Sequence, residues 1–255
     1  MRVRCRAVDV FLIGGGRDEA GVLASHRPFA AATSARGAPP VAFVLDEGEG
    51  TDPGRWTAAL AAAGAPGART VVVSPERPPA SADLDGAGGV FVAGGWTPGY
   101  QEAFAAAGES WAGALRAAGL PYAGFSAGAA IAATDAIVGG WRVARDGTEP
   151  LAVCAEEAGE DLDLVQPRSG LGLVPFAVDV HATQWGTLTR LVHAVASGLV
   201  AEGVAIDEGT CVEVPAGGSA GELRVHGLGS AYRVQRGAGA ATVTPLQSGH
   251  RPMQG

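Results

Sequence analysis

The stretch "YAGFSAGAAIAAT", residues 122 to 134, places one serine between two glycines, directly before a run of small residues. Gly-x-Ser-x-Gly between a buried strand and a helix is typical of a nucleophile elbow, a tight turn that raises the serine hydroxyl above the edge of a sheet. Amides at the start of the following helix can then stabilise an oxyanion. Ser126 is therefore a candidate nucleophile. The alternative, in a chain with 40 glycines, is a glycine-rich turn in which Ser126 only caps the helix.

A serine nucleophile needs a base, and the chain has five histidines. His181 ends the apolar stretch "FAVDVH" directly before the polar turn "ATQWG", where a parallel strand would open onto the same sheet edge as Ser126. His181 is therefore the candidate base. In an α/β-hydrolase the histidine comes far downstream of the serine. His226 or His250 would then have to serve instead.

The elements that must position these residues alternate along the chain. Apolar segments that predict buried strands cover residues 8–16, 40–48, 68–76, 88–96 and 120–126. Helices are predicted between them, at 52–67 with Asp52 as cap and Gly64 as stop, and at 97–119. This rhythm predicts an α/β fold with a mostly parallel central sheet and helices on both faces.

The second half of the chain has a different pattern. A strand is predicted at 171–181, a helix at 186–198, and antiparallel strands near the C-terminus at 203–214, 222–234 and 239–246. No linker divides the chain, so we expect a single domain over 1–255, with 240–255 as a mobile tail.

Composition limits the classes of function. Hydrophobic residues make up 47% of the 255 residues and charged residues 17%, which is typical of a globular protein. The net charge is −8 and no dense Lys/Arg cluster occurs, so we expect no nucleic-acid partner. No apolar segment is suited to crossing a membrane. Three widely spaced cysteines predict neither a metal site nor a disulfide framework, and indicate a cytoplasmic protein.

Five segments together resemble the peptidase E and cyanophycinase family of serine peptidases. They are "GFSAGA", "IVGG", "GLGLVPFAVDVH", "GTLTRLVHAV" and "GVAIDEGTCVEV", and the resemblance spans about residues 8 to 215. It implies a class I glutamine amidotransferase-like α/β fold, with Ser126 as nucleophile and His181 as base. It also implies that the Gly95 and Ala127 amides are the oxyanion donors.

The resemblance further implies hydrolysis of short or unusual peptides without a cofactor or metal. In the family these substrates are dipeptides with N-terminal Asp or the aspartate–arginine storage polymer. We accordingly expect a small peptide substrate, and the sequence is compatible with a homodimer. Two other functions stay open: an α/β-hydrolase-type esterase, and a non-catalytic relative that binds a small molecule or a partner.

The chain departs from the family pattern beside the expected site. Trp96 follows the Gly-Gly turn, where family members often carry Asn or Asp, and "ATQWGTLTR" follows His181, where aromatic residues and an Arg are common. Trp96 and Gln184 are therefore the candidates for substrate contact in an altered pocket.

The third member of the triad is not fixed by the sequence. The family places an acid shortly after "IVGG", but here "WRVARDG" follows, and then the acidic "EEAGED". We choose Glu157, with Glu160 and Asp146 as alternatives, and expect residues 145–168 to fold back over the sheet edge. The alternative is a solvated acidic loop. Asp179 lies on the same strand face as His181 and is expected to fix the local turn.

Overall fold

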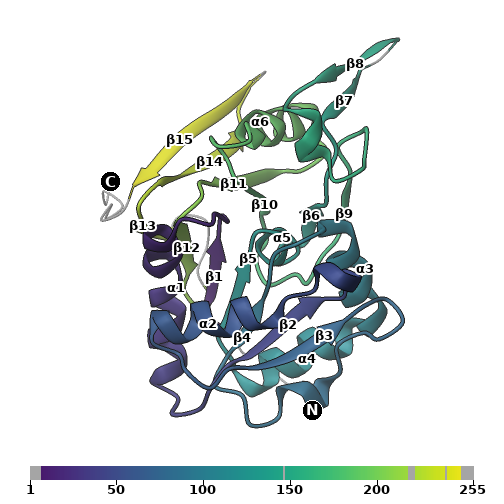
Figure 1. Cartoon of the computed structure of the whole chain (residues 1–255). Helices are drawn as coiled ribbons and strands as arrows, with labels where there is room; N and C mark the ends of the chain where they lie inside the picture. The colour runs from purple at the N-terminus through teal and green to yellow at the C-terminus, as the bar shows by residue number, and fades with distance from the viewer. Residues whose placement is uncertain (1–6, 146, 218–221, 239, 248–255) are drawn as a thin grey trace, which may run out of the picture.

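The computed structural model describes residues 7–247 apart from 146, 218–221 and 239. Its main sheet has seven strands in the order β13-β12-β1-β5-β4-β2-β3 (Figure 1). They are β1 (Val10–Ile13), β2 (Val41–Leu45), β3 (Arg69–Val73), β4 (Val90–Val92), β5 (Tyr122–Phe125), β12 (Thr210–Val214) and β13 (Arg224–Gly227). Strands β1 to β5 are parallel to one another, whereas β12 is antiparallel to both β1 and β13. The predicted fold class is confirmed.

The described part of the chain contains six α-helices and three short 3-10 helices. They are α1 (Glu19–Ser34), α2 (Pro53–Ala63), α3 (Thr97–Ala107), α4 (Glu109–Ala118), α5 (Ala127–Ala130), α6 (Thr187–Ser197), η1 (Gly48–Gly50), η2 (Ser81–Leu84) and η3 (Glu156–Gly159). The Asp52 carboxylate accepts a hydrogen bond from the third residue of α2, and Gly64 ends that helix in the left-handed conformation. Both positions are as predicted.

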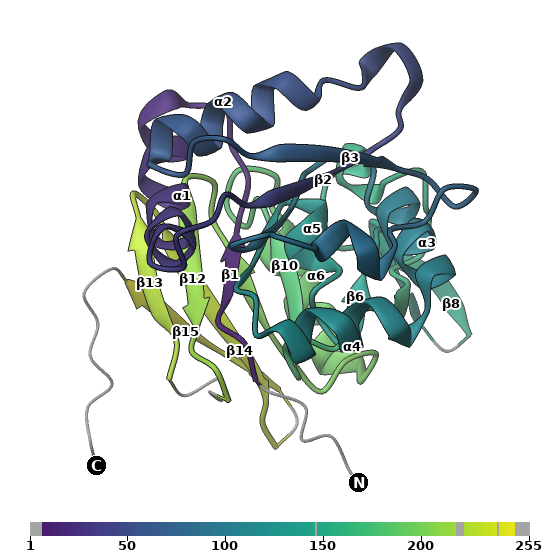
Figure 2. The same ribbon diagram turned by 90° about the horizontal axis from the view of Figure 1, so that it is seen from below.

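Two aromatic side chains show how the helices cover the sheet. Phe43 of β2 packs against rings of α3 and α4, whereas Phe91 of β4 packs against Phe29 of α1 and Trp56 of α2. The two helix pairs therefore lie on opposite faces, and Figure 2 shows α2 and α4 on either side of β2 and β3.

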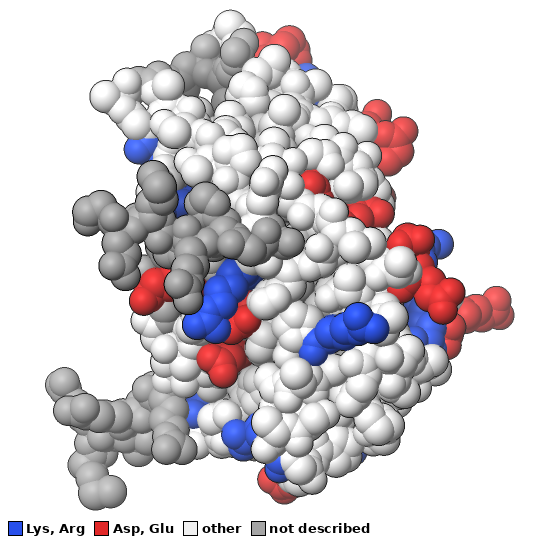
Figure 3. Space-filling view, turned by 90° about the vertical axis from the view of Figure 1, so that its left-hand side faces the viewer, with Lys and Arg blue, Asp and Glu red and all other residues white. Residues whose placement is uncertain are grey.

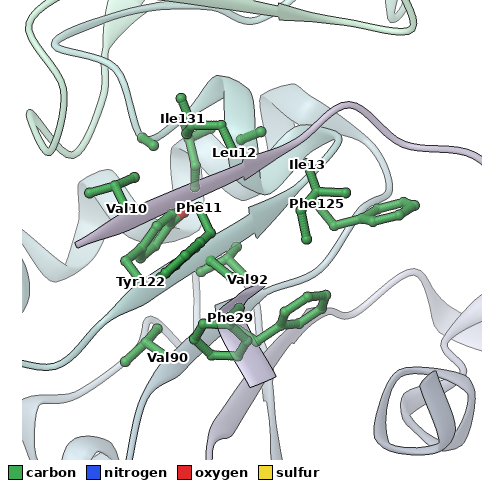
Figure 4. Close-up of a cluster of buried hydrophobic side chains, with 14 of the residues drawn as sticks. Val10, Phe11, Leu12, Ile13, Phe29, Val90, Val92, Tyr122, Phe125 and Ile131 are labelled. Atoms are coloured by element: carbon green, nitrogen blue, oxygen red, sulfur yellow. The ribbon is translucent and has the colours of Figure 1, made fainter. Parts of the chain in front are cut away.

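The core is built where β1, β4 and β5 run side by side. Apolar side chains of these three strands and Phe29 of α1 pack together there (Figure 4). Because both faces of the central strands are covered, their sequences are continuous apolar runs rather than alternating ones. The rigid strands end at one edge, where β1 and β5 deliver the glycine turn and Ser126.

A second sheet follows the order β10-β11-β14-β15. Its strands are β10 (Ala177–Val180), β11 (Glu202–Ile206), β14 (Ser230–Arg236) and β15 (Ala241–Gln247). The first two are parallel, which corrects the expectation of antiparallel pairing for β11 on that side, because α6 supplies the crossover between them. Residues 241–247 of the expected tail pair with β14, and 248–255 lie outside the described residues.

Two small antiparallel pairs complete the fold. They are β6 (Asp135–Ile137) with β9 (Pro167–Ser169), and β7 (Arg142–Arg145) with β8 (Thr148–Ala152). The β7–β8 hairpin projects from the body of the molecule (Figure 1), and η3 follows it. Residues 145–168 thus contain regular structure, not only a loop.

No helix in the described residues is both long enough and apolar enough to cross a membrane. On the face drawn in Figure 3, basic and acidic side chains are scattered among uncharged ones and the basic ones form no single patch.

Candidate active site

Ser126 lies between β5 and α5 with φ 51° and ψ −111°, a conformation that L-residues rarely adopt. Such a residue costs about 1–3 kcal/mol of backbone strain. Close packing explains the flanking glycines. A Cβ at Gly124 would lie 2.2 Å from the Gly128 carbonyl oxygen, and one at Gly128 would lie 2.3 Å from the Val92 carbonyl oxygen. The Ser126 side chain makes no capping bond to α5, so its hydroxyl is free for another partner.

That partner is His181. The residue follows β10 directly, and its N–H donates to the Gly14 carbonyl at 2.9 Å, which ties the end of β10 to the end of β1. His181 also has a positive φ of 56°. Its Nε2 lies 2.8 Å from Ser126 Oγ. The structure therefore brings together the two residues that the sequence proposed as nucleophile and base.

The glycine turn after β1 makes room for this ring. Gly15 has φ +105°, and a Cβ on it would lie 2.2 Å from His181 Cε1. A side chain at this position would push the imidazole away from Ser126. The "GGG" that ends the first apolar run thus serves the site directly.

The carboxylate at the other ring nitrogen belongs to Glu208. Its Oε1 lies 2.6 Å from His181 Nδ1. Because a carboxylate only accepts, Nδ1 carries the hydrogen and Nε2 is left to accept from the Ser126 hydroxyl. The sequence-based prediction of Glu157 for this place was wrong, because Glu208 is the partner of Nδ1. Glu157 is exposed, with no hydrogen bond to His181.

Of the alternatives to Glu157, Glu160 does not contact His181 either. Glu160 accepts hydrogen bonds from the Thr97 hydroxyl at 3.0 Å and from the Thr97 N–H at 3.3 Å. Asp146 lies outside the described residues. The acidic segment therefore does return to the sheet edge, but the Glu160 carboxylate binds Thr97, the first residue of α3, and not the histidine.

The order of the strands explains why Glu208 lies next to His181. It lies in the turn between β11, which is parallel to β10, and β12, which pairs with β1. The Gln184 side chain accepts from the Glu208 N–H at 3.0 Å, and Gly209 N–H donates to Gly15 O at 2.9 Å. The sequence signal was an acid directly after an apolar strand, in "AIDEG". This signal identifies Glu208 as the partner of His181 only when it is known that β11 lies beside β10.

Burial and the charge of Glu208 shift the pKa of His181 in opposite directions. Burial lowers the pKa of the imidazole below its ordinary value, and the hydrogen bond and charge of Glu208 oppose that shift. The net direction is downward, so the ring is neutral at neutral pH and can accept a proton.

Trp185 covers the other side of the imidazole. Its ring stacks on His181 with centroids 4.1 Å apart and planes 10° from parallel, and its backbone N–H donates to the His181 carbonyl at 2.9 Å. The stack restricts the ring to the plane that faces Ser126. Trp185 was not among the residues singled out from the sequence.

The two expected oxyanion donors flank Ser126. Ala127 is the first residue of α5, and Gly95 lies in the turn after β4. Within the described chain, neither N–H donates a hydrogen bond to a backbone carbonyl. The turn that carries Gly95 is held in place, because the backbone N–H of Trp96 donates to Glu47 Oε1 at 2.9 Å and the backbone N–H of Thr97 donates to Glu160.

A cavity of about 950 Å³ opens over these residues. Trp96 lines it together with Ser126 and His181, whereas Gln184 is not part of its lining and instead supports the Glu208 turn. The lining carries both signs of charge. Its exposed charged members are Arg17, Glu19, Arg55 and Glu157.

His226 has a partner away from Ser126. His226 Nε2 lies 2.8 Å from Glu213 Oε2, across the β12–β13 pair. His250 lies outside the described residues. The α/β-hydrolase alternative, which needed one of them as base, has no support in this geometry. Among the described residues no group of three or more His, Cys, Asp or Glu is arranged to hold a metal ion.

No family model matches the chain, and the comparison with curated proteins found no match. Solved structures do resemble it. A peptidase from an acI-B1 Actinobacterium aligns with a TM-score of 0.58 and 17% identity, over 96% of both chains. A protein from Listeria monocytogenes EGD-e, provisionally named Peptidase E, aligns with a TM-score of 0.54 and 16% identity, over 88% of this chain and 100% of its own. The chain has a peptidase E-like fold.

A buried ion pair supports the histidine within this peptidase E-like fold. Asp179 of β10 accepts from Arg190 of α6 at 2.7 and 2.9 Å, and both side chains are buried. Arg190 also donates to the carbonyls of Gly140 and Ala158. Asp179 therefore fixes β10 against α6 and, through Arg190, against Gly140 and η3, and it makes no hydrogen bond to His181.

Proposed function

We propose that the chain is a serine-type peptidase that hydrolyses short peptides through an acyl-enzyme. The observation that supports this most is the continuous line from Ser126 Oγ to His181 Nε2 at 2.8 Å and from His181 Nδ1 to Glu208 at 2.6 Å. It supplies a nucleophile, a base and a group that orients the base. The fold of two structures named as peptidases agrees with that chemistry.

The proposed reaction has two halves. Ser126 Oγ attacks the peptide carbonyl while its proton passes to His181 Nε2, and the Gly95 and Ala127 amides bind the resulting oxyanion. The C–N bond then breaks as Nε2 returns the proton to the leaving amine. A water repeats the sequence on the ester, with His181 first accepting and then donating the proton, and frees Ser126. Glu208 stabilises the imidazolium in both halves.

We expect the residues that line the cavity to determine which peptides bind. Its exposed charges have both signs, so the lining does not single out an acidic peptide. We propose peptides with N-terminal Asp and aspartate–arginine polymer as the first substrates to compare with neutral dipeptides.

A substrate panel with one matched variant tests the proposal. Wild-type protein and Ser126→Ala are assayed on the peptides above and on p-nitrophenyl acetate. Loss of the nucleophile should lower turnover by about 10⁴-fold or more, while circular dichroism and thermal melting show an intact fold. Undiminished hydrolysis by a folded Ser126→Ala protein would contradict Ser126 as the nucleophile. No hydrolysis of any substrate by the wild type would contradict the proposal and favour a non-catalytic relative.

A further inference from the structure

Two exposed tryptophans line the cavity beside Ser126. Trp96 is 42% exposed and Trp185 is 45% exposed. The other large apolar residues that are exposed in the described chain do not line this cavity; they are Leu164, Leu199, Leu228 and Val243. Large apolar side chains that are left exposed in a cavity are typical of a ligand-binding surface. The exposed part of neither indole has a role in the proposed reaction.

Trp185 lies on the side of the cavity from which the leaving group departs. In the proposed reaction His181 Nε2, which is 2.8 Å from Ser126 Oγ, returns its proton to the leaving amine. That nitrogen must therefore come within hydrogen-bond reach of Nε2. The side chain of the leaving residue begins only two bonds from the same nitrogen. Because the ring centroids of Trp185 and His181 are 4.1 Å apart, the indole borders the space that this side chain enters.

The turn that carries Trp185 is anchored independently of the indole. The N–H and hydroxyl of Thr183 donate to Asp207 Oδ1 at 3.1 and 2.7 Å, and the Gln184 side chain accepts from the Glu208 N–H at 3.0 Å. One face of the indole is already fixed by its stack on the imidazole. The exposed surface of the ring is therefore pre-organised, and a ligand that binds it pays little for ordering it.

We propose that Trp185 forms the wall of a subsite for the side chain of the leaving residue, and that this subsite prefers an uncharged aromatic side chain. The exposed indole offers a flat surface on which an aromatic ring stacks favourably. His181 becomes an imidazolium in the transition state, against the indole, so a cationic side chain at this place would be repelled. The inference rests on the proposed peptidase function, because it assigns a place to the group that the reaction releases.

Acyl transfer to an added amine tests the subsite, because it is the reverse of the step that releases the leaving group. p-Nitrophenyl acetate first acetylates Ser126. The amine nitrogen then attacks the ester carbonyl, while His181 Nε2 takes a proton from the amine and returns it to Ser126 Oγ. A C–N bond forms and the C–Oγ bond breaks. The amine therefore reacts from the position that the leaving group occupies in hydrolysis.

Two amines that differ only by a phenyl ring compete for the acetyl-enzyme. Phenylalaninamide and alaninamide are added at equal concentration, and mass spectrometry gives the ratio of the two N-acetyl products after subtraction of the reaction with Ser126→Ala. The wild type should favour phenylalaninamide by about five-fold or more. Equal yields, or no transfer to either amine, overturn the subsite.

Two variants of Trp185 separate recognition from support of the histidine. Trp185→Leu should lower the product ratio to below about two, and Trp185→Phe, which keeps an aromatic ring, should fall between Trp185→Leu and the wild type. If the indole only supports His181, its loss slows both transfers equally. An unchanged ratio in Trp185→Leu therefore overturns the assignment. If Trp185→Leu does not fold, the ratio in the wild type decides the proposal.

Trp96→Leu is the matched control. Trp96 is about equally exposed in the same cavity, but among the described residues the ring that stacks on His181 is that of Trp185. The product ratio should stay at its wild-type value in Trp96→Leu. A fall as large as that in Trp185→Leu overturns the assignment to Trp185.

The two proposals fail in different ways. Ser126-dependent release of p-nitrophenol, without discrimination between the two amines, overturns the subsite and leaves the peptidase function standing. No Ser126-dependent release of p-nitrophenol and no hydrolysis of any peptide overturn the peptidase function, and the leaving-group subsite with it.

Discussion

Two regions bring carboxylates to the edge of the sheet, and they differ in how the fold places them. The segment "EEAGED" carries four acids within six residues, yet the described structure brings none of them to His181. The turn between β11 and β12 contributes Glu208, which lies 2.6 Å from Nδ1. The comparison shows that adjacency of strand ends, and not local density of charge, decides which acid can orient the base.

The first prediction compares these two regions directly and has the largest expected effect. Glu208→Gln keeps the shape but removes the charge that stabilises the imidazolium, and should lower kcat/KM by about 10³–10⁴-fold. Glu157→Gln is the comparison from the acidic segment. Its carboxylate lines the cavity but does not contact His181, so this variant should change kcat by less than about two-fold, whatever its effect on KM. Steady-state kinetics on the best peptide checks both. The opposite ranking of the two variants would return the role to the acidic segment.

A second prediction concerns Gly15, in the turn after β1, which leaves room for the His181 ring. Gly15→Ala places a methyl group 2.2 Å from His181 Cε1 at a residue with φ +105°. Displacement of the ring from Ser126 should lower kcat by about 10²-fold, with a lower melting temperature. Wild-type kcat in this variant would show that the imidazole does not need the position it occupies over Gly15.

A third prediction concerns what the acidic segment does. Glu160 binds the hydroxyl and N–H of Thr97, next to the turn that carries the Gly95 amide. Glu160→Ala should loosen that turn and lower kcat by about ten-fold. Glu160→Gln keeps one acceptor oxygen and should fall between Glu160→Ala and the wild type. Kinetics of both variants, with Glu157→Gln as baseline, measures the effect, and equal activities of all three would remove this role.

The smallest expected effect is on the pH profile. His181 acts as base only when unprotonated, so kcat/KM falls as pH decreases through its pKa. Burial lowers that pKa, so the acidic limb should have its midpoint below about 6.5, the ordinary value for histidine. Glu208 opposes the shift, and Glu208→Gln should therefore move the limb to still lower pH. A limb that moves upward in Glu208→Gln contradicts the contact with His181.

Local patterns in the sequence were sufficient to predict much of this architecture. The strand–turn–helix context of Ser126, the strand end at His181 and the helix limits at Asp52 and Gly64 each depend on residues close together in the chain. The position of Glu208 does not, because it depends on β11 lying parallel to β10 and β12 lying beside β1. Trp185 was missed for a similar reason, since stacking follows from the backbone turn after His181.

The central claim is that Ser126, His181 and Glu208 act as one unit, and a double-mutant cycle tests it most directly. The rate at which a fluorophosphonate modifies Ser126 is measured by intact-protein mass spectrometry in wild type, Glu208→Gln, His181→Ala and the double variant. Glu208 acts through His181, so Glu208→Gln should slow modification by about 10³-fold in the wild-type background and hardly at all in His181→Ala. Equal slowing in both backgrounds, or no slowing in either, would contradict the triad.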